Sequence, residues 1–385
     1  MPALVVAALS ARMFAQSARR AGWDVIALDL FGDVDTRAAA SAWHAIGDPA
    51  ALRIDRARFL AALDSARTYG GCIGWIAGAG FEPQPDLLDE AARILPLLGN
   101  DRTRTDRVRD PPQFFAKLAE LAIAHPDTRT DAPADRRGWL VKDFAASGGW
   151  HVRRAETVHS WRSGARTFFQ REMPGQPISV LFAAADGRAR CIGINELLVQ
   201  AHADRPYIYH GALGPVAGLP QALAQGLMRA VDELVRGFDL RGLGSLDVLV
   251  HGKSFSVLEI NPRPSATLGL YDADFATGLI KVHVDACAGV LPAALPGIDT
   301  PTVRGEFIVF ARESQVMTQA HVERLLALGC HDVPQPQSAL TAGAPLCSVV
   351  AQGTNRGAVR AMLAEREAAV LSIVQNRSEG PHHAE

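Results

Sequence analysis

The chain has 385 residues, of which 48% are hydrophobic and 21% are charged, and its formal net charge is −2. This length and composition are those of a globular protein with two or three cores. The near-zero net charge argues against nucleic acid or a membrane surface as a partner, because neither would attract the protein strongly. The five cysteines form no C-x-x-C pair, which argues against a disulfide framework or zinc ribbon and predicts a cytoplasmic location.

The N-terminal part alternates apolar strands with helical segments. Predicted strands cover 3–9, 24–29 and 72–77, and predicted helices cover 11–21 and 57–66. Short glycine-marked turns separate them, which favours a parallel, doubly wound sheet, so we expect residues 1–105 to form a Rossmann-like domain. The first apolar run lacks a basic segment before it and is expected to be a buried strand rather than a signal peptide. No apolar run reaches the roughly 18–20 residues of a membrane-spanning helix.

A second, smaller domain is expected over residues 106–175. It begins with a polar stretch that contains a helix predicted over 112–124, and it continues with the strand W-L-V-K, residues 139–142. The small-residue loop 145–149 and a further strand, T-F-F-Q-R-E, follow.

A strand-rich domain is expected over residues 176–300. The segments I-S-V-L-F-A-A-A and C-I-G-I-N-E-L-L-V flank an Asp-Gly turn, which is a strong signal for a hairpin. An amphipathic helix is predicted over 220–237, and G-S-L-D-V-L-V and F-S-V-L-E-I are predicted to form a second hairpin across the turn H-G-K-S.

The C-terminal part, 301–376, is expected to be a small extension that contains β-structure. Its strands are predicted at 305–311 and 345–351, and a final helix is predicted over 355–376. The polar residues 377–385 are expected to form a disordered tail.

The most informative motif is V-L-E-I-N-P-R-P-S, residues 257–265, in the last strand of the second hairpin. Side chains alternate along a strand, so Glu259, Asn261 and Arg263 are predicted to share one face. The residues predicted to form the core are Val257, Leu258 and Ile260. A polar face on a core strand indicates either a structural network or a ligand site.

Pairing across the H-G-K-S turn adds a second carboxylate to this face. The predicted register places residue 250 opposite 256, and Asp247 opposite Glu259. Together with Asn261, the two acids form a set of oxygen ligands that suits Mg²⁺, which binds one or two carboxylates and phosphate oxygens.

Three further segments could bind a phosphorylated ligand. Arg263 could hold a phosphate through two hydrogen bonds, and its alternative role is a buried ion pair with one of the acids. Two carboxylates around one arginine would, however, repel each other without a metal. Lys142 and the loop 145–149 could supply a charge and backbone N–H groups, although small loops between strands are common. The strand end at 170–175 could offer backbone groups to a base, or it could be a plain strand followed by a Pro-Gly turn.

In combination, these motifs resemble the ATP-grasp superfamily. Its members carry, in order, a Rossmann-like domain, a lysine strand with a glycine-rich loop, a hinge segment, an acidic strand and E-x-N-x-R. The chain has all five features over about residues 1–290. The resemblance implies an α/β ATP-grasp fold, in which the small domain 106–175 is a lid that closes over the nucleotide and an antiparallel-sheet domain follows. It also implies binding of ATP with Mg²⁺, for which Mn²⁺ could substitute.

The resemblance also assigns roles to individual residues. The residues expected at the ATP phosphates are Lys142, Ser147, Gly148 and Gly149, and those expected around adenine are Gln170, Arg171 (through its backbone) and Met173. The residues expected to hold Mg²⁺ are Asp247, Glu259 and Asn261, with Arg263 facing the γ-phosphate or an acyl phosphate. Arg107, in T-D-R-V, takes the position of a nucleotide-contacting lysine of the family, with its charge but not its geometry.

The activity implied is that of an ADP-forming ligase that joins a small-molecule carboxylate to an amine through an acyl phosphate. The stretches A-L-S-A-R and A-L-D-L-F-G-D-V-D-T-R are similar to a subgroup of predicted carboligases. Some of that subgroup accompany tetrahydromethanopterin- and methanofuran-linked one-carbon metabolism. Open alternatives are a non-catalytic nucleotide sensor and a bicarbonate-using carboxylase. An NAD-dependent oxidoreductase is disfavoured, because the first turn lacks G-x-G-x-x-G. A homodimer is a possible assembly.

A second substrate would need contacts beyond the nucleotide. The candidates are Ser10, Arg12, His210 and Gly211, together with the loop G-A-G-F-E at 78–82. The alternatives are plain turns and, for His210, a structural role.

Overall fold

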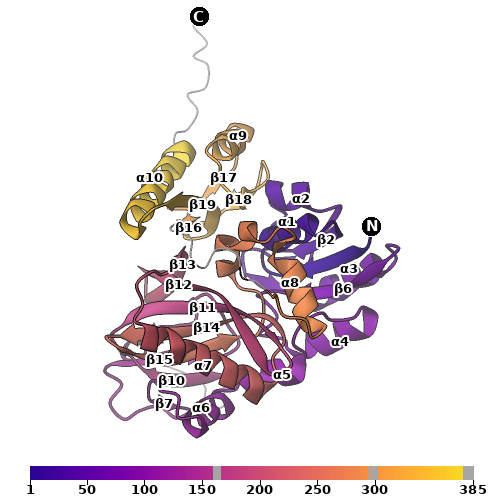
Figure 1. Cartoon of the computed structure of the whole chain (residues 1–385). Helices are drawn as coiled ribbons and strands as arrows, with labels where there is room; N and C mark the ends of the chain where they lie inside the picture. The colour runs from indigo at the N-terminus through magenta and orange to yellow at the C-terminus, as the bar shows by residue number, and fades with distance from the viewer. Residues whose placement is uncertain (159–165, 294, 296–301, 376–385) are drawn as a thin grey trace, which may run out of the picture.

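The computed structural model describes residues 1–158, 166–293, 295 and 302–375 (Figure 1). The tail 377–385, predicted to be disordered, lies outside these residues. Within them, the helices are all too short or too polar to cross a membrane.

The N-terminal domain contains a parallel sheet, as predicted, and its strand order is β3-β2-β1-β6. Its strands are β1 (Ala3–Ala7), β2 (Asp24–Asp29), β3 (Ala42–Ala45) and β6 (Cys72–Ala77), and a short hairpin comprises β4 (Gly47–Asp48) and β5 (Arg53–Ile54). Its helices are α1 (Arg12–Arg20), α2 (Val34–Ala39), α3 (Arg56–Arg67) and α4 (Asp86–Ile94). Strand β1 is buried throughout, which explains its continuous apolar sequence.

The small subdomain carries a four-stranded sheet in the order β7-β10-β8-β9. Its elements are α5 (Arg102–Arg109), α6 (Pro111–Glu120), β7 (Thr128–Arg129), β8 (Trp139–Asp143), β9 (Arg153–Arg154) and β10 (Thr167–Arg171). Asp110 lies between the two helices and caps the second, since its side chain accepts the backbone N–H of Gln113. The chain therefore turns sharply directly after Arg109.

The central domain is a seven-stranded antiparallel sheet in the order β15-β14-β11-β12-β13-β16-β19. The strands are β11 (Gln176–Ala185), β12 (Arg188–His202), β13 (Arg205–Gly214), β14 (Gly242–His251), β15 (Ser254–Asn261), β16 (Val303–Phe310) and β19 (Pro345–Gly353). The Asp-Gly turn joins β11 to β12, as predicted. The C-terminal extension is joined to this sheet, because β16 pairs with β13.

The remaining elements cover the sheet and the C-terminal extension. They are α7 (Gln221–Phe238), α8 (Gly278–Cys287), α9 (Gln319–Ala327), α10 (Arg356–Gln375), and the two-stranded ladder of β17 (Gln315–Val316) and β18 (Ala339–Leu340). On β11, Ile178 and Val180 point into a core that includes residues of α6 and α7, whereas Leu181 and Ala183 point to the opposite face.

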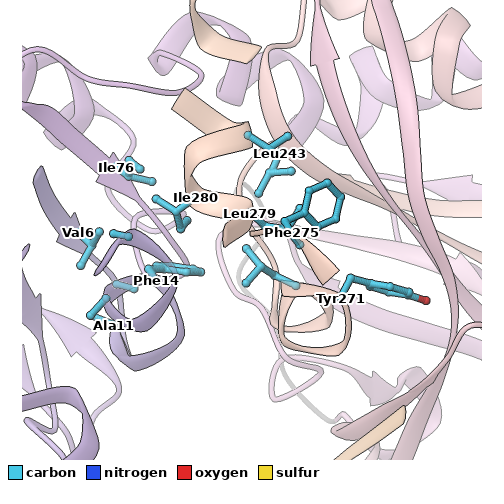
Figure 2. Close-up of a cluster of buried hydrophobic side chains, with 14 of the residues drawn as sticks. Val6, Ala11, Phe14, Ile76, Leu243, Tyr271, Phe275, Leu279 and Ile280 are labelled. Atoms are coloured by element: carbon cyan, nitrogen blue, oxygen red, sulfur yellow. The ribbon is translucent and has the colours of Figure 1, made fainter. Parts of the chain in front are cut away.

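That opposite face joins the central sheet to the N-terminal domain. Figure 2 shows Val6, Phe14 and Ile76 of the N-terminal domain beside Leu279 and Ile280, with Leu243 of the central sheet in the same cluster. This core fills one end of the face. Ser179, also on this face, lies where the core ends and lines a cavity.

The register of the β14–β15 hairpin differs in part from the prediction. Asp247 pairs with Glu259, as predicted, but Val250 pairs with Phe255 instead of residue 256. A bulge at Leu258 accounts for the difference, since the next pair after Asp247–Glu259 is Val248–Val257. The bulge also corrects the predicted core: Leu258 is half-buried and lines the cavity beside Glu259.

Candidate functional site

A cavity of about 1220 Å³ lies where the domains meet. Its walls come from the N-terminal loops 49–53 and 79–83, the small-subdomain segments 142–152 and 170–175, the face of the central sheet, and the loop 341–345. Single small-molecule sites are usually about 300–1000 Å³, so this cavity has room for more than one reactant.

The acidic end of the cavity is built on the β14–β15 hairpin. Asp247 accepts a hydrogen bond from the Ser179 hydroxyl at 2.6 Å and one from the Asn261 amide at 3.1 Å. Burial and the nearby charge of Glu259 raise the pKa of Asp247 to about 7. A cation between the two carboxylates would relieve this repulsion.

The donor set fits a hard cation that keeps part of its coordination for other ligands. Among the described residues, no three His, Cys, Asp or Glu side chains are grouped to hold a metal ion. Two carboxylates and the amide of Asn261 would therefore act together with phosphate or water oxygens, which is the usual environment of Mg²⁺.

Lys142 and Gln170 face this end from the small subdomain. Lys142 pairs with Phe168 across β8 and β10, so Gln170 lies diagonally opposite on the same face. The Lys142 ammonium donates a hydrogen bond to Gln170 Oε1 at 2.6 Å. Burial lowers the pKa of Lys142, although Glu259 and Asp247 oppose that shift. Gln170 Nε2 is buried and has no partner within the described residues, so a hydrogen-bond donor remains unused there.

The loop of Ser147, Gly148 and Gly149 lies against β13 and lines the cavity. The backbone N–H of Tyr209 donates to the carbonyl oxygen of Gly148 at 3.0 Å. At Gly149, where φ is +79°, a Cβ atom would lie 1.8 Å from the Tyr207 carbonyl oxygen. Only glycine allows the loop to approach β13 this closely.

The cation at the start of the small subdomain is Arg109, which the sequence analysis missed. Its Nε and Nη2 groups donate to the carbonyl oxygens of Phe144 and Ala146 at 3.1 and 2.7 Å. Its Nη1 lies 3.5 Å from Glu259 Oε2. The dipeptide Asp-Pro directly after it predicts the start of the next helix, but no local signal indicates that Arg109 faces the cavity.

Arg107, predicted to contact the nucleotide, lies outside the cavity lining. Its guanidinium donates to the Gly237 carbonyl oxygen at 2.8 Å and lies over the Phe238 ring at 5.4 Å. Two positions along a helix change direction by about 200°. This rotation turns Arg107 towards α7 and Arg109 towards the cavity.

Arg263 lines the cavity but also forms an ion pair. Its Nε and Nη2 groups lie 2.7 Å from Glu82 Oε1. Burial alone would raise the pKa of Glu82, but Arg263 and Arg109 lower it to about 2. The buried ion pair that was the alternative for Arg263 is therefore present. Its acid is Glu82, from the loop 78–82, and neither Asp247 nor Glu259.

Two residues predicted to contact a second substrate lie elsewhere in the structure. Ser10 and Arg12 lie outside the cavity lining, and both contact Asp332, with the Arg12 Nε and Nη2 groups each at 2.8 Å from its carboxylate. These contacts hold the N-terminal domain to the C-terminal extension. Arg171 and Met173, which were predicted to lie around adenine, both line the cavity. The backbone N–H of Arg171 donates to the Asp127 carbonyl oxygen at 2.7 Å, so this donor is already engaged.

His210 and Gly211 also lie outside the cavity lining. The His210 ring packs on Phe307 with centroids 4.4 Å apart, and Nε2 lies 3.6 Å from Glu367. A Cβ atom at Gly211 would lie 1.9 Å from the Glu306 carbonyl oxygen, so this glycine permits the close pairing of β13 with β16.

Comparison with known proteins accounts for this arrangement. Residues 109–267 match a family described as an ATP-grasp domain. The structure resembles the biotin carboxylase–ATP complex of Campylobacter jejuni, with a TM-score of 0.72 over 97% of this chain and 95% of that one, at 13% identity. The chain therefore contains a region that matches the ATP-grasp domain family, and it has the ATP-grasp fold. The predicted fold class is thereby confirmed.

Two other solved structures share this fold. The L-amino acid ligase of Bacillus licheniformis has a TM-score of 0.70 at 12% identity, covering 96% of this chain and 97% of that one. The biotin carboxylase domain dimer of Hydrogenobacter thermophilus 2-oxoglutarate carboxylase, in complex with MgADP and bicarbonate, has a TM-score of 0.71 at 11% identity, covering 97% and 94%. At such identities the likeness shows the fold alone.

A curated relative gives a partial match. The carbamoyl phosphate synthase large chain of Thermomicrobium roseum is 29% identical over 202 residues, which are 47% of this chain and 18% of the relative. The chain thus matches about a fifth of that relative's length.

Proposed function

We propose that this protein is an ADP-forming, ATP- and Mg²⁺-dependent ligase that joins a carboxylate to an amine. The observation that carries the proposal is the pairing of Asp247 with Glu259 in a cavity that is also lined by the basic residues Arg109, Lys142 and Arg263. Adjacent carboxylates suit a divalent cation, and the basic groups suit the phosphates that a nucleotide would bring with it.

The nucleotide would lie between the small subdomain and the central sheet. Lys142, Arg109 and the loop 147–149 would contact its phosphates. The unused amide donor of Gln170, the Arg171 carbonyl and Met173 would lie near the base. Asp247, Glu259 and Asn261 would hold Mg²⁺, which when bound neutralises charge on the transferring phosphoryl group.

The chemistry requires positioning and charge neutralisation rather than a nucleophile from the protein. A substrate carboxylate oxygen forms a bond to the γ-phosphorus, the bond to the bridging oxygen breaks, and ADP leaves. The amine then attacks the acyl carbon, and phosphate and a proton leave as the amide forms. Arg263 and Lys142 would offset the negative charge that gathers on the transferring group. The lid would exclude water from the acyl phosphate.

A carboxylase is the second candidate, because bicarbonate can attack ATP as a carboxylate does and would give carboxyphosphate. Its support is the likeness to biotin carboxylases and to a carbamoyl phosphate synthase. The ligase proposal has support from the L-amino acid ligase likeness and from the sequence motifs. The sequence resemblance suggests a precursor of a one-carbon cofactor as one substrate, and we include this substrate class in the ligase proposal.

The test is release of ADP from MgATP in the presence of pooled amino acids, amines, one-carbon cofactor precursors or bicarbonate. Glu259→Gln should abolish pool-dependent release. Glu156→Gln, which changes an exposed carboxylate outside the cavity lining, should retain it. Release that depends on bicarbonate alone would favour the carboxylase. Tight ATP binding without release from any pool would favour a nucleotide sensor, and no ATP binding would overturn the proposal.

A further inference from the structure

His151 lines the cavity but was not among the predicted site residues. It belongs to the same small-subdomain wall as Lys142 and the loop 147–149. The charged groups that act on its ring are Glu259, Lys142, Arg109 and Asp143, which places it at the acidic and phosphate end of the cavity.

The backbone on both sides of His151 is fixed. The Trp150 carbonyl oxygen accepts a hydrogen bond from Arg205 Nε at 2.7 Å. The Val152 N–H donates to the Gly149 carbonyl oxygen at 3.1 Å. The Trp150 ring also packs edge-on to His202, with centroids 6.2 Å apart. The direction of the His151 side chain is therefore set by the folded loop.

The ring of His151 is not held as structural histidines are. In His283, Nδ1 accepts the Leu243 N–H and Nε2 lies 2.9 Å from the Leu98 carbonyl oxygen, so both nitrogens are satisfied. In His151, Nδ1 is buried and has no partner within the described residues. A buried polar atom without a partner costs free energy, so its retention needs an explanation.

The protonation state of the His151 ring follows from the groups that surround it. Burial lowers the pKa of His151 to about 4, and Lys142 and Arg109 act in the same direction against Glu259 and Asp143. The imidazole is therefore neutral near pH 7 and carries one proton. A proton on Nδ1 would be buried without an acceptor, whereas a proton on Nε2 can reach the cavity, because Nδ1 is on the covered edge of the ring.

We propose that the neutral imidazole of His151 donates its Nε2–H to an oxygen of the β- or γ-phosphate of the bound nucleotide. This inference rests on the proposed function, and it adds a side-chain contact to a loop whose expected contacts are backbone N–H groups. A neutral donor suits this position, since Lys142, Arg109 and Arg263 already supply positive charge. The donor would also be directed by its loop rather than by a flexible stem.

The experiment compares glutamine and asparagine at position 151, whose side-chain amides lie at different distances from the backbone. The amide nitrogen of glutamine can occupy the position of histidine Nε2, whereas that of asparagine lies near the position of Nδ1. We would measure by calorimetry the affinity of the magnesium complex of β,γ-methylene ATP, and the affinity of AMP, for the wild type and for His151→Gln, His151→Asn and His151→Leu. Thermal unfolding of each variant would show that it is folded.

The expected result is a loss of affinity for the triphosphate analogue of roughly 10- to 100-fold in His151→Asn and His151→Leu, the usual range for one hydrogen bond to a charged group. His151→Gln should stay within about threefold of the wild type, and AMP affinity should stay unchanged in all variants. Wild-type affinity in His151→Asn, or equal losses in all three variants, would overturn the inference. If the wild type itself bound no nucleotide, the proposed function would fail instead.

Discussion

Arg263 and Glu82 form an ion pair between two domains, although they lie 181 positions apart in the sequence. Glu82 comes from the loop after β6, and Arg263 directly follows β15. The Gly80 N–H donates to Glu82 Oε2 at 2.7 Å, so the carboxylate is itself held in place. The orientation of Arg263 in the cavity therefore depends on the N-terminal domain, and the two domains share one wall of the site.

The first prediction concerns Glu82→Gln. The pKa of Glu82 is lowered from 4.5 to about 2 in the folded protein, so its charge stabilises the fold above pH 4.5, and that contribution is lost as the pH falls towards 2. We expect the variant to have a lower free energy of unfolding at pH 7, by roughly 3 kcal/mol, and the difference to shrink to about half near pH 3. Urea unfolding at several pH values measures this. A difference that is constant with pH would contradict the ion-pair explanation.

Local patterns predicted the hairpin that carries Asp247 and Glu259, because alternation along strands indicates which residues share a face. The two-residue turn alone would place Asp247 opposite Leu258, and the bulge at Leu258 brings Glu259 opposite Asp247. Local patterns did not predict the bulge at Leu258, since nothing in an apolar strand marks where one residue leaves the ladder. The Arg12–Asp332 contact was also unpredictable. It depends on how the N-terminal domain and the C-terminal extension pack, and no local pattern encodes a contact between segments 320 residues apart.

The second prediction compares Arg109→Gln with Arg107→Gln. Arg109 joins the loop 144–146 to Glu259, and its loss removes a charge from the phosphate end of the cavity. We expect the affinity for MgATP analogues to fall at least about 10-fold, as for other charged hydrogen bonds. Arg107→Gln is the matched control. It should leave the affinity within about threefold, because Arg107 contacts α7 instead. Equal losses in both variants would contradict the assignment.

The third prediction concerns Gly149→Ala. The new Cβ atom would lie 1.8 Å from the Tyr207 carbonyl oxygen, so the loop could not stay on β13. Gly148→Ala is the control, since its φ is also positive, at +68°, but its nearest neighbour would be Trp150 Cδ1 at 3.5 Å.

Both variants should lose about 1–2 kcal/mol of stability from the left-handed backbone. Only Gly149→Ala should also lose most of its nucleotide affinity, because the displaced loop no longer lines the phosphate end. Thermal unfolding and nucleotide titration separate the two effects. Equal affinities in the two variants would show that contact with β13 does not position the loop.

The fourth prediction is that Asp247→Asn stabilises the metal-free protein while it abolishes metal binding. Burial and Glu259 raise the pKa of Asp247 from 3.8 to about 7, so the folded protein binds a proton more tightly than the unfolded chain does. The ionised Asp247 carboxylate therefore lowers the free energy of unfolding. This loss of stability is absent below about pH 4, grows as the pH rises, and is complete above about pH 7. Without metal, the variant should gain of the order of 4 kcal/mol at pH 8 and little at pH 4.

Magnesium should make the wild type more stable than Asp247→Asn, which is the opposite of the order expected without metal. In the wild type, Mg²⁺ with ADP should raise the unfolding temperature, because the cation compensates the two opposed carboxylates and its binding stabilises the folded state. Asp247→Asn should show no such magnesium-dependent rise, although it begins from the higher value. Unfolding scans at pH 8 with EDTA, and with Mg²⁺ and ADP, compare the two states directly. A variant that is less stable than the wild type in EDTA would show that the hydrogen bonds from Ser179 and Asn261 outweigh the repulsion between Asp247 and Glu259.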